Sequence, residues 1–180
     1  MVVSVTRNRT SAATPGRDAK TLDRRRAKAE TTDGRALHSC PAHRWVEERK
    51  KHILPIPYFH VVFTLPHAFN PLWRLNPRVM GTLLFHSAID ALRGLLAEPE
   101  RLGAEPGITV TLETWDDRLF FHPHLHCLVT GGGLSPEGDW KDVPSPRCLV
   151  AVTPLMVGFR KRFCQGLRQL VQEEALTLPE

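Results

Sequence analysis

The sequence lacks the long apolar stretch, about eighteen residues, that a transmembrane helix needs, and its N-terminus lacks the apolar core of a secretory signal. Its four cysteines are widely spaced and show no disulfide framework. These absences predict a cytoplasmic protein with reduced thiols and no membrane partner. Tyrosine is nearly absent as well. Tyr58 is the only one, so chemistry that needs two phenols is excluded for this chain.

Positive charge is concentrated near the N-terminus. Residues 1–51 hold 13 Lys and Arg against 6 Asp and Glu (net +7), and residues 52–180 hold 11 against 13 (net −2), which gives the total of +5. A basic arm on a near-neutral domain suits a polyanion such as nucleic acid, and it equally suits a solvated tail. Residues 1–36 have few large apolar side chains, so we expect a disordered basic arm.

The pattern of apolar residues predicts an α+β fold. An all-apolar, β-prone segment indicates a buried strand, and helical spacing of apolar residues indicates two amphipathic helices. The predicted elements are a strand at 58–65, a helix at about 72–97 broken near Pro77, a strand at 107–115, a histidine-rich strand at 120–130, turns at 131–133 and 135–138, a strand at 147–152 and a helix from Pro154. We therefore expect an antiparallel sheet with helices on one side.

Three histidines at alternating positions are the strongest functional signal. His122, His124 and His126 share one face of the predicted strand, because successive side chains of a strand point to opposite faces. The other face takes apolar or small residues, as a core-facing side would. Imidazole is a common ligand of divalent metals, so this face predicts a metal site. The alternative is a histidine-rich strand on a solvated sheet.

Two longer strings carry a resemblance to a known family. Residues 55–66 (Pro-Ile-Pro-Tyr-Phe-His-Val-Val-Phe-Thr-Leu-Pro) and the motifs within 114–135 (Thr-Trp, His-Pro-His-Leu-His-Cys and Gly-Gly-Gly-Leu-Ser) resemble the rolling-circle, two-tyrosine transposases of bacterial insertion sequences. That family belongs to the HUH endonucleases, named for a histidine–hydrophobic–histidine pair. The resemblance covers about residues 40–180. It implies an HUH fold, similar to the RNA-recognition-motif fold, with Phe63-Thr64-Leu65 in its central strand.

The resemblance also implies a chemistry. His124 and His126 would bind Mg²⁺ or Mn²⁺, which polarises the scissile phosphate for attack by a tyrosine. The implied partner is single-stranded DNA at insertion-sequence ends, in the bacterial cytoplasm at the nucleoid. Trp115 and Arg118, near the predicted hairpin turn, could stack on bases and pair with phosphates. A core position is the alternative for Trp115.

Two imidazoles leave a cation under-coordinated, and HUH enzymes add a third polar ligand. Glu113 is the first candidate, because a turn centred on residues 117–118 puts it opposite His122 on the histidine face. Relatives usually carry histidine at this position. The alternatives are an exposed, non-ligating Glu113, His122 as the third ligand, or, more weakly, His60, for which a structural role is favoured.

The sequence departs from the family at the nucleophile. The family uses a pair of tyrosines on a helix downstream of the histidines, whereas Tyr58 lies upstream of them and matches neither. Relatives also continue well beyond the equivalent of Glu180. We therefore expect the N-terminal fragment of a transposase that has no catalytic nucleophile of its own and does not cleave DNA alone.

A second departure concerns zinc. Relatives begin with a cysteine-rich zinc module, but here Cys40-Pro-Ala-His43 is C-x₂-H where C-x₂-C is expected, a weak zinc signal. The predicted organisation is a disordered arm at 1–36, a remnant of the zinc module at 37–54 and an incomplete HUH transposase domain at 55–180.

Three functions fit these features. The first is a transposase domain that binds single-stranded DNA and a divalent metal. The second is a non-catalytic DNA-binding remnant that regulates or competes with an intact transposase, which would then be a partner, as would a second copy of the chain. The third is a metal-dependent phosphodiesterase that uses water, with Asp116 or Asp117 as the general base.

Overall fold

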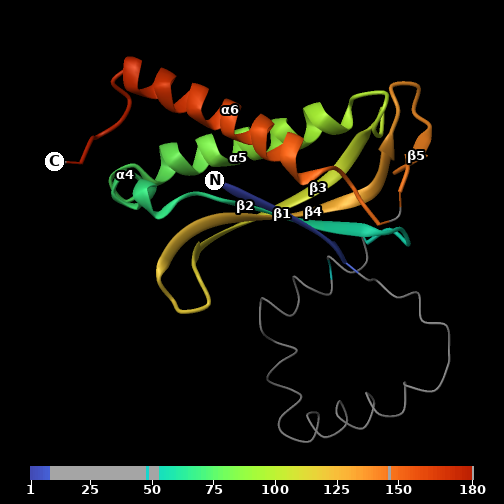
Figure 1. The fold of residues 1–180 in the computed structure, drawn as a ribbon, viewed down its shortest axis with the longest axis horizontal. Coiled ribbons are helices and arrows are strands. Elements are labelled where there is room, and N and C mark those ends of the chain that lie inside the picture. The colour runs from blue at the N-terminus through green and yellow to red at the C-terminus, as the bar shows by residue number, and fades with distance from the viewer. Residues whose placement is uncertain (9–47, 49–52, 146, 180) are drawn as a thin grey trace, which may run out of the picture. The chain divides into compact units, whose positions relative to one another are not determined.

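A computed structural model describes residues 1–8, 48, 53–145 and 147–179 (Figure 1). Met1–Arg9 and Ile56–Glu180 form one compact unit, and Thr10–Pro55 is assigned to another. The elements of the first unit are, in order, β1 (Val2–Asn8), β2 (Tyr58–Thr64), the 3-10 helix η1 (His67–Phe69), α4 (Asn70–Leu75), α5 (Pro77–Leu96), β3 (Glu105–Trp115), β4 (Phe121–Leu134), β5 (Trp140–Asp142) and α6 (Val152–Gln172).

The strands form one antiparallel sheet in the order β1-β2-β4-β3, with β5 paired to the end of β4. Helices α5 and α6 lie side by side and cover one face (Figure 1). The predicted α+β architecture with helices on one side is confirmed. β2 lies between β1 and β4, as expected for the all-apolar strand at 58–65.

The core lies between the sheet and the two helices. Alternate residues of β2 and β4 point toward the helices and are fully buried, which leaves the intervening histidines on the opposite face. Phe159 of α6 packs edge-on against Phe63 of β2, with ring centroids 4.8 Å apart. Each such side chain stabilises the fold by roughly 1.5–3 kcal/mol through burial. The fully buried members include Phe59, Val61, Phe63, Leu125, Cys127, Val129, Leu84, Leu92, Leu155, Phe159 and Phe163.

Helix α5 is long and apolar enough to cross a membrane by length and composition. Eight of its residues are buried, Met80, Leu84 and Leu92 among them, and it packs against α6. A helix that packs against both a sheet and a neighbouring helix needs a wide apolar face. The composition of α5 is therefore that of a core helix.

The N-terminus corrects the prediction of a disordered arm. Residues 2–8 form β1, an edge strand that pairs with β2 from Val2↔Thr64 to Asn8↔Tyr58. Val3 is buried and Val5 lies against the core, because they alternate with Ser4 and Thr6. The prediction failed here because it was based on the composition of all 36 residues, to which this short run of β-branched residues contributes little. The rest of the predicted arm, and most of segment 37–54, lie outside the described residues.

Two further predictions were wrong. Residues 147–152 form no strand: Leu149 and Val150 are buried, but only an isolated bridge joins Ser145 to Cys148, and α6 begins at Val152. An apolar run therefore indicated burial rather than sheet pairing. The three glycines at 131–133 lie within β4 instead of a turn, whereas Gly138, with φ +91°, does occupy a turn.

The glycines are required because other backbone segments approach β4 closely. A Cβ on Gly131 would lie 2.8 Å from the Pro57 carbonyl oxygen, and one on Gly133 would overlap the Glu105 carbonyl. Both neighbours are backbone atoms and cannot rotate away. Glycine is therefore needed at these positions for close packing of strands, not for turn formation.

Replacement of Gly133 tests this packing. We expect Gly133→Ala to lower the free energy of unfolding by about 1–3 kcal/mol, the usual cost of forcing extra atoms into a packed site. The matched control is Gly158→Ala in α6, where the nearest neighbour is the flexible Arg162 side chain at 3.4 Å. That change should be neutral or stabilise by up to about 1 kcal/mol. Urea unfolding measures both, and equal effects would contradict the argument.

The three described cysteines, Cys127, Cys148 and Cys164, are free thiols. Burial raises the pKa of Cys127 to about 12. This side chain therefore stays protonated at neutral pH and belongs to the core, on the face opposite the histidines.

Candidate metal centre

The pairing of β3 with β4 brings a carboxylate to the histidines. Glu113 lies opposite His124, and Thr111 lies opposite His126. The predicted partner of Glu113 was His122, so the pairing differs by two residues. The connection between the strands is longer than expected: Asp116 N–H donates to the Phe120 carbonyl, Leu119 adopts φ 62°, and the register shifts between Glu113 and Trp115. A slip of two residues keeps Glu113 on the predicted face.

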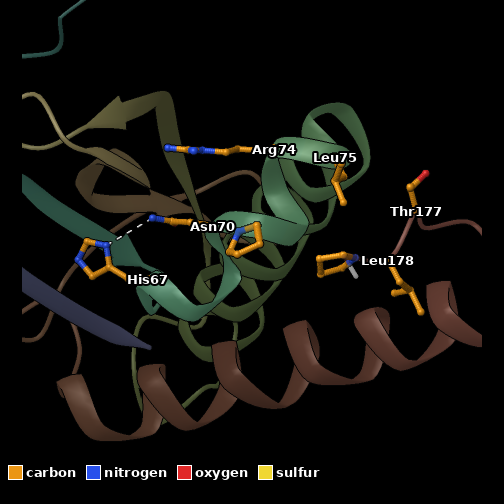
Figure 2. Close-up of a pocket in the computed structure, with 8 residues that line it drawn as sticks. His67, Asn70, Arg74, Leu75, Thr177 and Leu178 are labelled. Atoms are coloured by element: carbon orange, nitrogen blue, oxygen red, sulfur yellow. Dashed lines mark hydrogen bonds between the residues drawn. The ribbon is translucent and has the colours of Figure 1, made fainter.

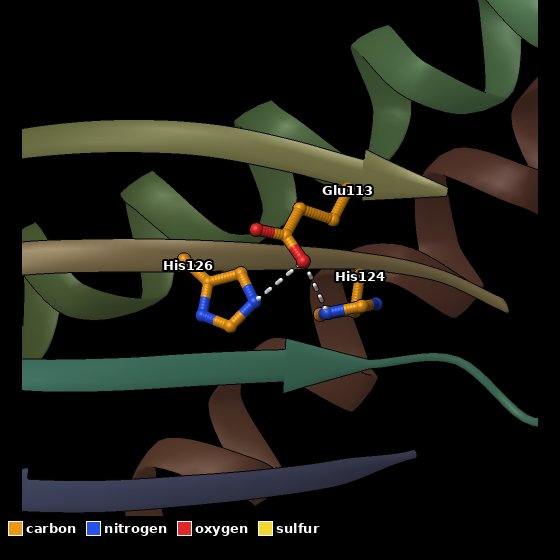
Figure 3. Close-up of side chains that lie close together, drawn as sticks. All are labelled: Glu113, His124 and His126. Carbon is orange, nitrogen blue, oxygen red and sulfur yellow. Dashed lines mark ion pairs between the residues drawn. The ribbon is translucent and has the colours of Figure 1, made fainter. Parts of the chain in front are cut away.

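The three side chains converge on a small space (Figure 3). Glu113 Oε2 lies 3.6 Å from His124 Nε2 and 3.5 Å from His126 Nε2. All three donor atoms lie within 4.8 Å of one another, so that one ion could contact them all. The side chains of His124 and His126 are 12% and 30% exposed, which leaves a carboxylate beside two largely sheltered imidazoles.

The other ring nitrogen of each histidine already has a partner. His124 Nδ1 donates to the carbonyl oxygen of His122 at 2.7 Å. His126 Nδ1 lies 2.7 Å from His60 Nε2. His126 Nε2, by contrast, is buried and makes no hydrogen bond. Because a neutral imidazole with a proton on Nδ1 offers a lone pair at Nε2, the bond to the carbonyl directs the lone pair of His124 toward Glu113.

His60 lies on the histidine face of β2, next to the cluster. The His60 ring is nearly parallel to the His126 ring: the interplanar angle is 8° and the ring centroids are 4.9 Å apart. Burial lowers the pKa of His60, and the neighbouring His126 lowers it further. His60 is not one of the converging donors, so the structure gives no support to its weaker prediction as the third ligand.

His122 lies on the same face, but outside the converging group. Its ring packs against His67, which follows β2, at 4.6 Å between centroids, and against His124 at 5.6 Å. Its Nδ1 is buried without a hydrogen-bond partner. Burial lowers the pKa of His122, and His67 and His124 lower it further. His67 carried no signal in the sequence that would have placed it here.

The hairpin tip beside the cluster exposes large side chains. Trp115, Leu119 and Phe120 are 54%, 81% and 63% exposed. The alternative of a core position for Trp115 was therefore wrong. Arg118 is exposed in the same turn. The turn itself is held by Asp116, whose Oδ1 accepts hydrogen bonds from the backbone N–H groups of Arg118 and Phe120, both at 2.9 Å.

Three cavities adjoin along this side of the domain. The first, about 420 Å³, lies over the cluster and shares Asp116 and Asp117 with a second of about 610 Å³. The second shares His67, Asn70 and Arg74 with a third of about 800 Å³, between α4 and residues 177–179 (Figure 2). This row of three adjoining cavities, the trough, runs from the cluster to Arg74.

The remaining candidate residues lie elsewhere. Cys40 and His43, the suggested zinc remnant, are outside the described residues. Tyr58 is 8% exposed and opposite Thr130, while His126 is opposite Val62, four residues further along β2. At about 3.3 Å per residue, Tyr58 lies roughly 13 Å along the strand from the cluster.

Comparisons with known proteins agree with the motifs. Residues 107–180 match the model of a family described as "Putative transposase". "Putative transposase y4qJ" of Sinorhizobium fredii (strain NBRC 101917 / NGR234) is 41% identical over 125 residues, which are 69% of this chain and 31% of that protein. "Transposase for insertion sequence element IS801" of Pseudomonas savastanoi pv. phaseolicola is 37% identical over 112 residues, 61% of this chain and 26% of that protein. The chain thus spans less than a third of the length of these relatives.

The fold is similar to that of TrwC, in a structure described as complexed with a 27-mer DNA comprising the recognition hairpin and the cleavage site. The TM-score is 0.51 at 12% identity, over 63% of this chain and 45% of that one. This likeness agrees with the expected HUH-type fold, and the histidine–hydrophobic–histidine pair, His124 and His126, lies on the open face of the sheet. The family model over residues 107–180 and the two transposase relatives agree with the resemblance to transposases of bacterial insertion sequences that the motifs gave.

Proposed function

We propose that this domain binds single-stranded DNA on its histidine face and holds one divalent cation, Mg²⁺ or Mn²⁺, as the DNA-cleaving part of a transposase. The observation that carries the proposal is the convergence of two Nε2 atoms on one carboxylate oxygen at 3.5–3.6 Å. These distances exceed those of good hydrogen bonds, so mutual hydrogen bonding does not explain the arrangement. The carboxylate suits the hard cations Mg²⁺ and Mn²⁺, and neutral imidazole is a common ligand of divalent metal ions.

A cation held there would neutralise negative charge that develops on the phosphoryl oxygens of a scissile phosphate. The residues of the chain would hold and orient it: Glu113 supplies charge, and His124 and His126 supply neutral nitrogens. His122 completes the imidazole-rich wall of the first cavity. This open, polar site can admit a flexible strand, which a narrow enclosed pocket could not.

The trough gives the DNA a path away from the cation. It passes Arg118 and the exposed ring of Phe120 and then reaches Arg74. Cations for the phosphates and aromatic rings for the bases are the elements of single-strand binding. The Lys and Arg residues of positions 9–47, which lie outside the described residues, would add electrostatic attraction. The site of action would be the nucleoid, at insertion-sequence ends.

Replacing Trp115 tests the role of the hairpin tip. We expect Trp115→Ala to weaken binding of single-stranded DNA roughly 5- to 150-fold, because stacking on one base contributes about 1–3 kcal/mol. Trp140→Ala is the matched control: this tryptophan is also exposed, at 41%, but it lies opposite Leu134, ten residues along β4 from His124.

Arg118→Ala should weaken binding of single-stranded DNA less than Trp115→Ala does. It should also reduce the slope of log K against log salt by about 1, since one phosphate contact is lost. Arg168 is an exposed residue of α6, which covers the face of the sheet opposite the histidines, so Arg168→Ala should leave the slope unchanged. Fluorescence anisotropy over a salt series measures all four variants. Equal effects of the hairpin and control variants would contradict the proposed surface.

One observation favours the non-catalytic alternative for this chain. The single tyrosine is buried in β2, roughly 13 Å along that strand from the residue opposite His126. The chain would therefore bind DNA without cleaving it and could regulate or compete with an intact transposase. The phosphodiesterase alternative is less favoured. Asp116 is held in turn hydrogen bonds, chiefly from Phe120, that lower its pKa, and a carboxylate with a lowered pKa is a weak general base.

A further inference from the structure

We infer that His60 is a positioning residue: it accepts a hydrogen bond from His126 Nδ1 and so fixes His126 with its Nε2 lone pair directed at the cation. This inference rests on the proposed metal site. It assigns to β2 a part in a site whose direct ligands all come from β3 and β4.

The first support is the geometry of the pair. His60 Nε2 and His126 Nδ1 are 2.7 Å apart, a short hydrogen bond, and the rings are inclined by only 8°. Parallel rings joined edge to edge place each nitrogen lone pair or N–H bond nearly in the plane of the other ring. The bond therefore restricts rotation of the His126 ring about its χ2 angle.

The second support is the direction of that bond. If His60 were the donor, His126 would carry its proton on Nε2, where the nearest acceptor, Glu113 Oε2, lies 3.5 Å away and makes no hydrogen bond to this buried nitrogen. With His126 as the donor, Nε2 is a lone pair, the form in which imidazole binds a metal. His126 would then have the same Nδ1-protonated form that the His122 carbonyl imposes on His124.

The proposed ligands His124 and His126 are thus oriented by different kinds of hydrogen-bond partner. The partner of His124 is a backbone carbonyl two residues away, which is present whatever the side chains are. The partner of His126 is a side chain 66 residues away, brought near by the pairing of β2 with β4. Only the second can be removed by substitution, so His60 offers a direct test of whether orientation of a ligand matters here.

The experiment compares His60→Leu with His60→Gln. Leucine cannot accept a hydrogen bond, whereas the amide oxygen of glutamine can. We expect His60→Leu to weaken Mn²⁺ binding about 10- to 100-fold in calorimetry, and His60→Gln to restore affinity to within a few-fold of the unsubstituted chain. Thr109→Val, on the same face of β3, is the control for altering an exposed side chain. Thermal unfolding without metal reports whether each variant folds.

A second readout does not depend on metal. In the metal-free chain, ¹⁵N NMR of the imidazole nitrogens should show the proton of His126 on Nδ1, and His60→Leu should shift the population toward the Nε2-protonated form. A proton on Nε2 of His126 in the unsubstituted chain would overturn the inference.

The outcomes separate the two proposals. If the unsubstituted chain binds no Mn²⁺, the metal site itself fails. If it binds Mn²⁺ and His60→Leu binds equally well, only the positioning role fails. If both His60 variants lose binding as completely as His126→Ala, His60 is a direct ligand and the positioning role is likewise overturned.

Discussion

His126→Ala and His124→Ala are each expected to abolish detectable Mn²⁺ binding in calorimetry. Each removes one of three converging donors, and the loss should exceed the roughly 10- to 100-fold that removal of an outer hydrogen-bond partner costs. Glu113→Gln should retain weak binding, because it keeps an oxygen ligand and removes the negative charge. Glu113→Ala should bind less well than Glu113→Gln.

The matched control is His86→Ala. His86 is an exposed histidine on α5, which covers the opposite face of the sheet, and its removal should leave affinity unchanged. Circular dichroism of each variant distinguishes loss of a ligand from loss of fold. Affinity like that of the unsubstituted chain in either His124→Ala or His126→Ala would end the metal assignment.

The sequence could predict this cluster in part because a strand has a period of two. Alternation placed His124 and His126 on one face, and the hairpin brought Glu113 to the same face although the predicted pairing was two residues out. An error of one residue would have put the carboxylate in the core. When the length of the turn is unknown, the face of the sheet on which a residue lies can therefore be predicted more reliably than its exact cross-strand partner.

Contacts between segments distant in sequence could not be predicted from the alternation of residues along a strand. The bond between His60 and His126 depends on β2 lying next to β4, and no local pattern states which strands are neighbours. The same holds for β1, whose Asn8 pairs with Tyr58 fifty residues away. His67 and Arg74 join the trough only because the chain turns from β2 into α4 beside the hairpin tip. Tertiary pairing, rather than local propensity, decides these positions.

On the proposed function, binding of DNA and binding of the cation are expected to be separable in this domain. The groups proposed to hold the strand, Trp115, Arg118 and Arg74, are exposed and adjoin the cluster without belonging to it. Substitutions there should therefore change DNA affinity while Mn²⁺ affinity remains. A chain that binds both DNA and the cation but has no phenol beside the cation is expected to form the complex without cleaving the DNA.

The 180-residue chain, mixed with Mn²⁺ and end-labelled single-stranded DNA that carries an insertion-sequence end, is expected to bind the DNA without forming a covalent adduct. Cleavage of the HUH type joins the enzyme to DNA through a phosphotyrosine bond, so it needs a phenol beside the cation. The only phenol here is Tyr58, which is 8% exposed and roughly 13 Å along β2 from the residue opposite His126.

A denaturing gel reads the adduct as labelled DNA that migrates with the protein, and a native gel run in parallel shows that the complex formed. The His126→Ala variant should bind DNA in the native gel and also give no adduct. An adduct from the unsubstituted chain that disappears in Tyr58→Phe would make Tyr58 a nucleophile and contradict the strand geometry. Nicking that needs Mn²⁺ and leaves no adduct would instead favour the phosphodiesterase, because water would then be the nucleophile, and Asp117 would be the first general base to replace.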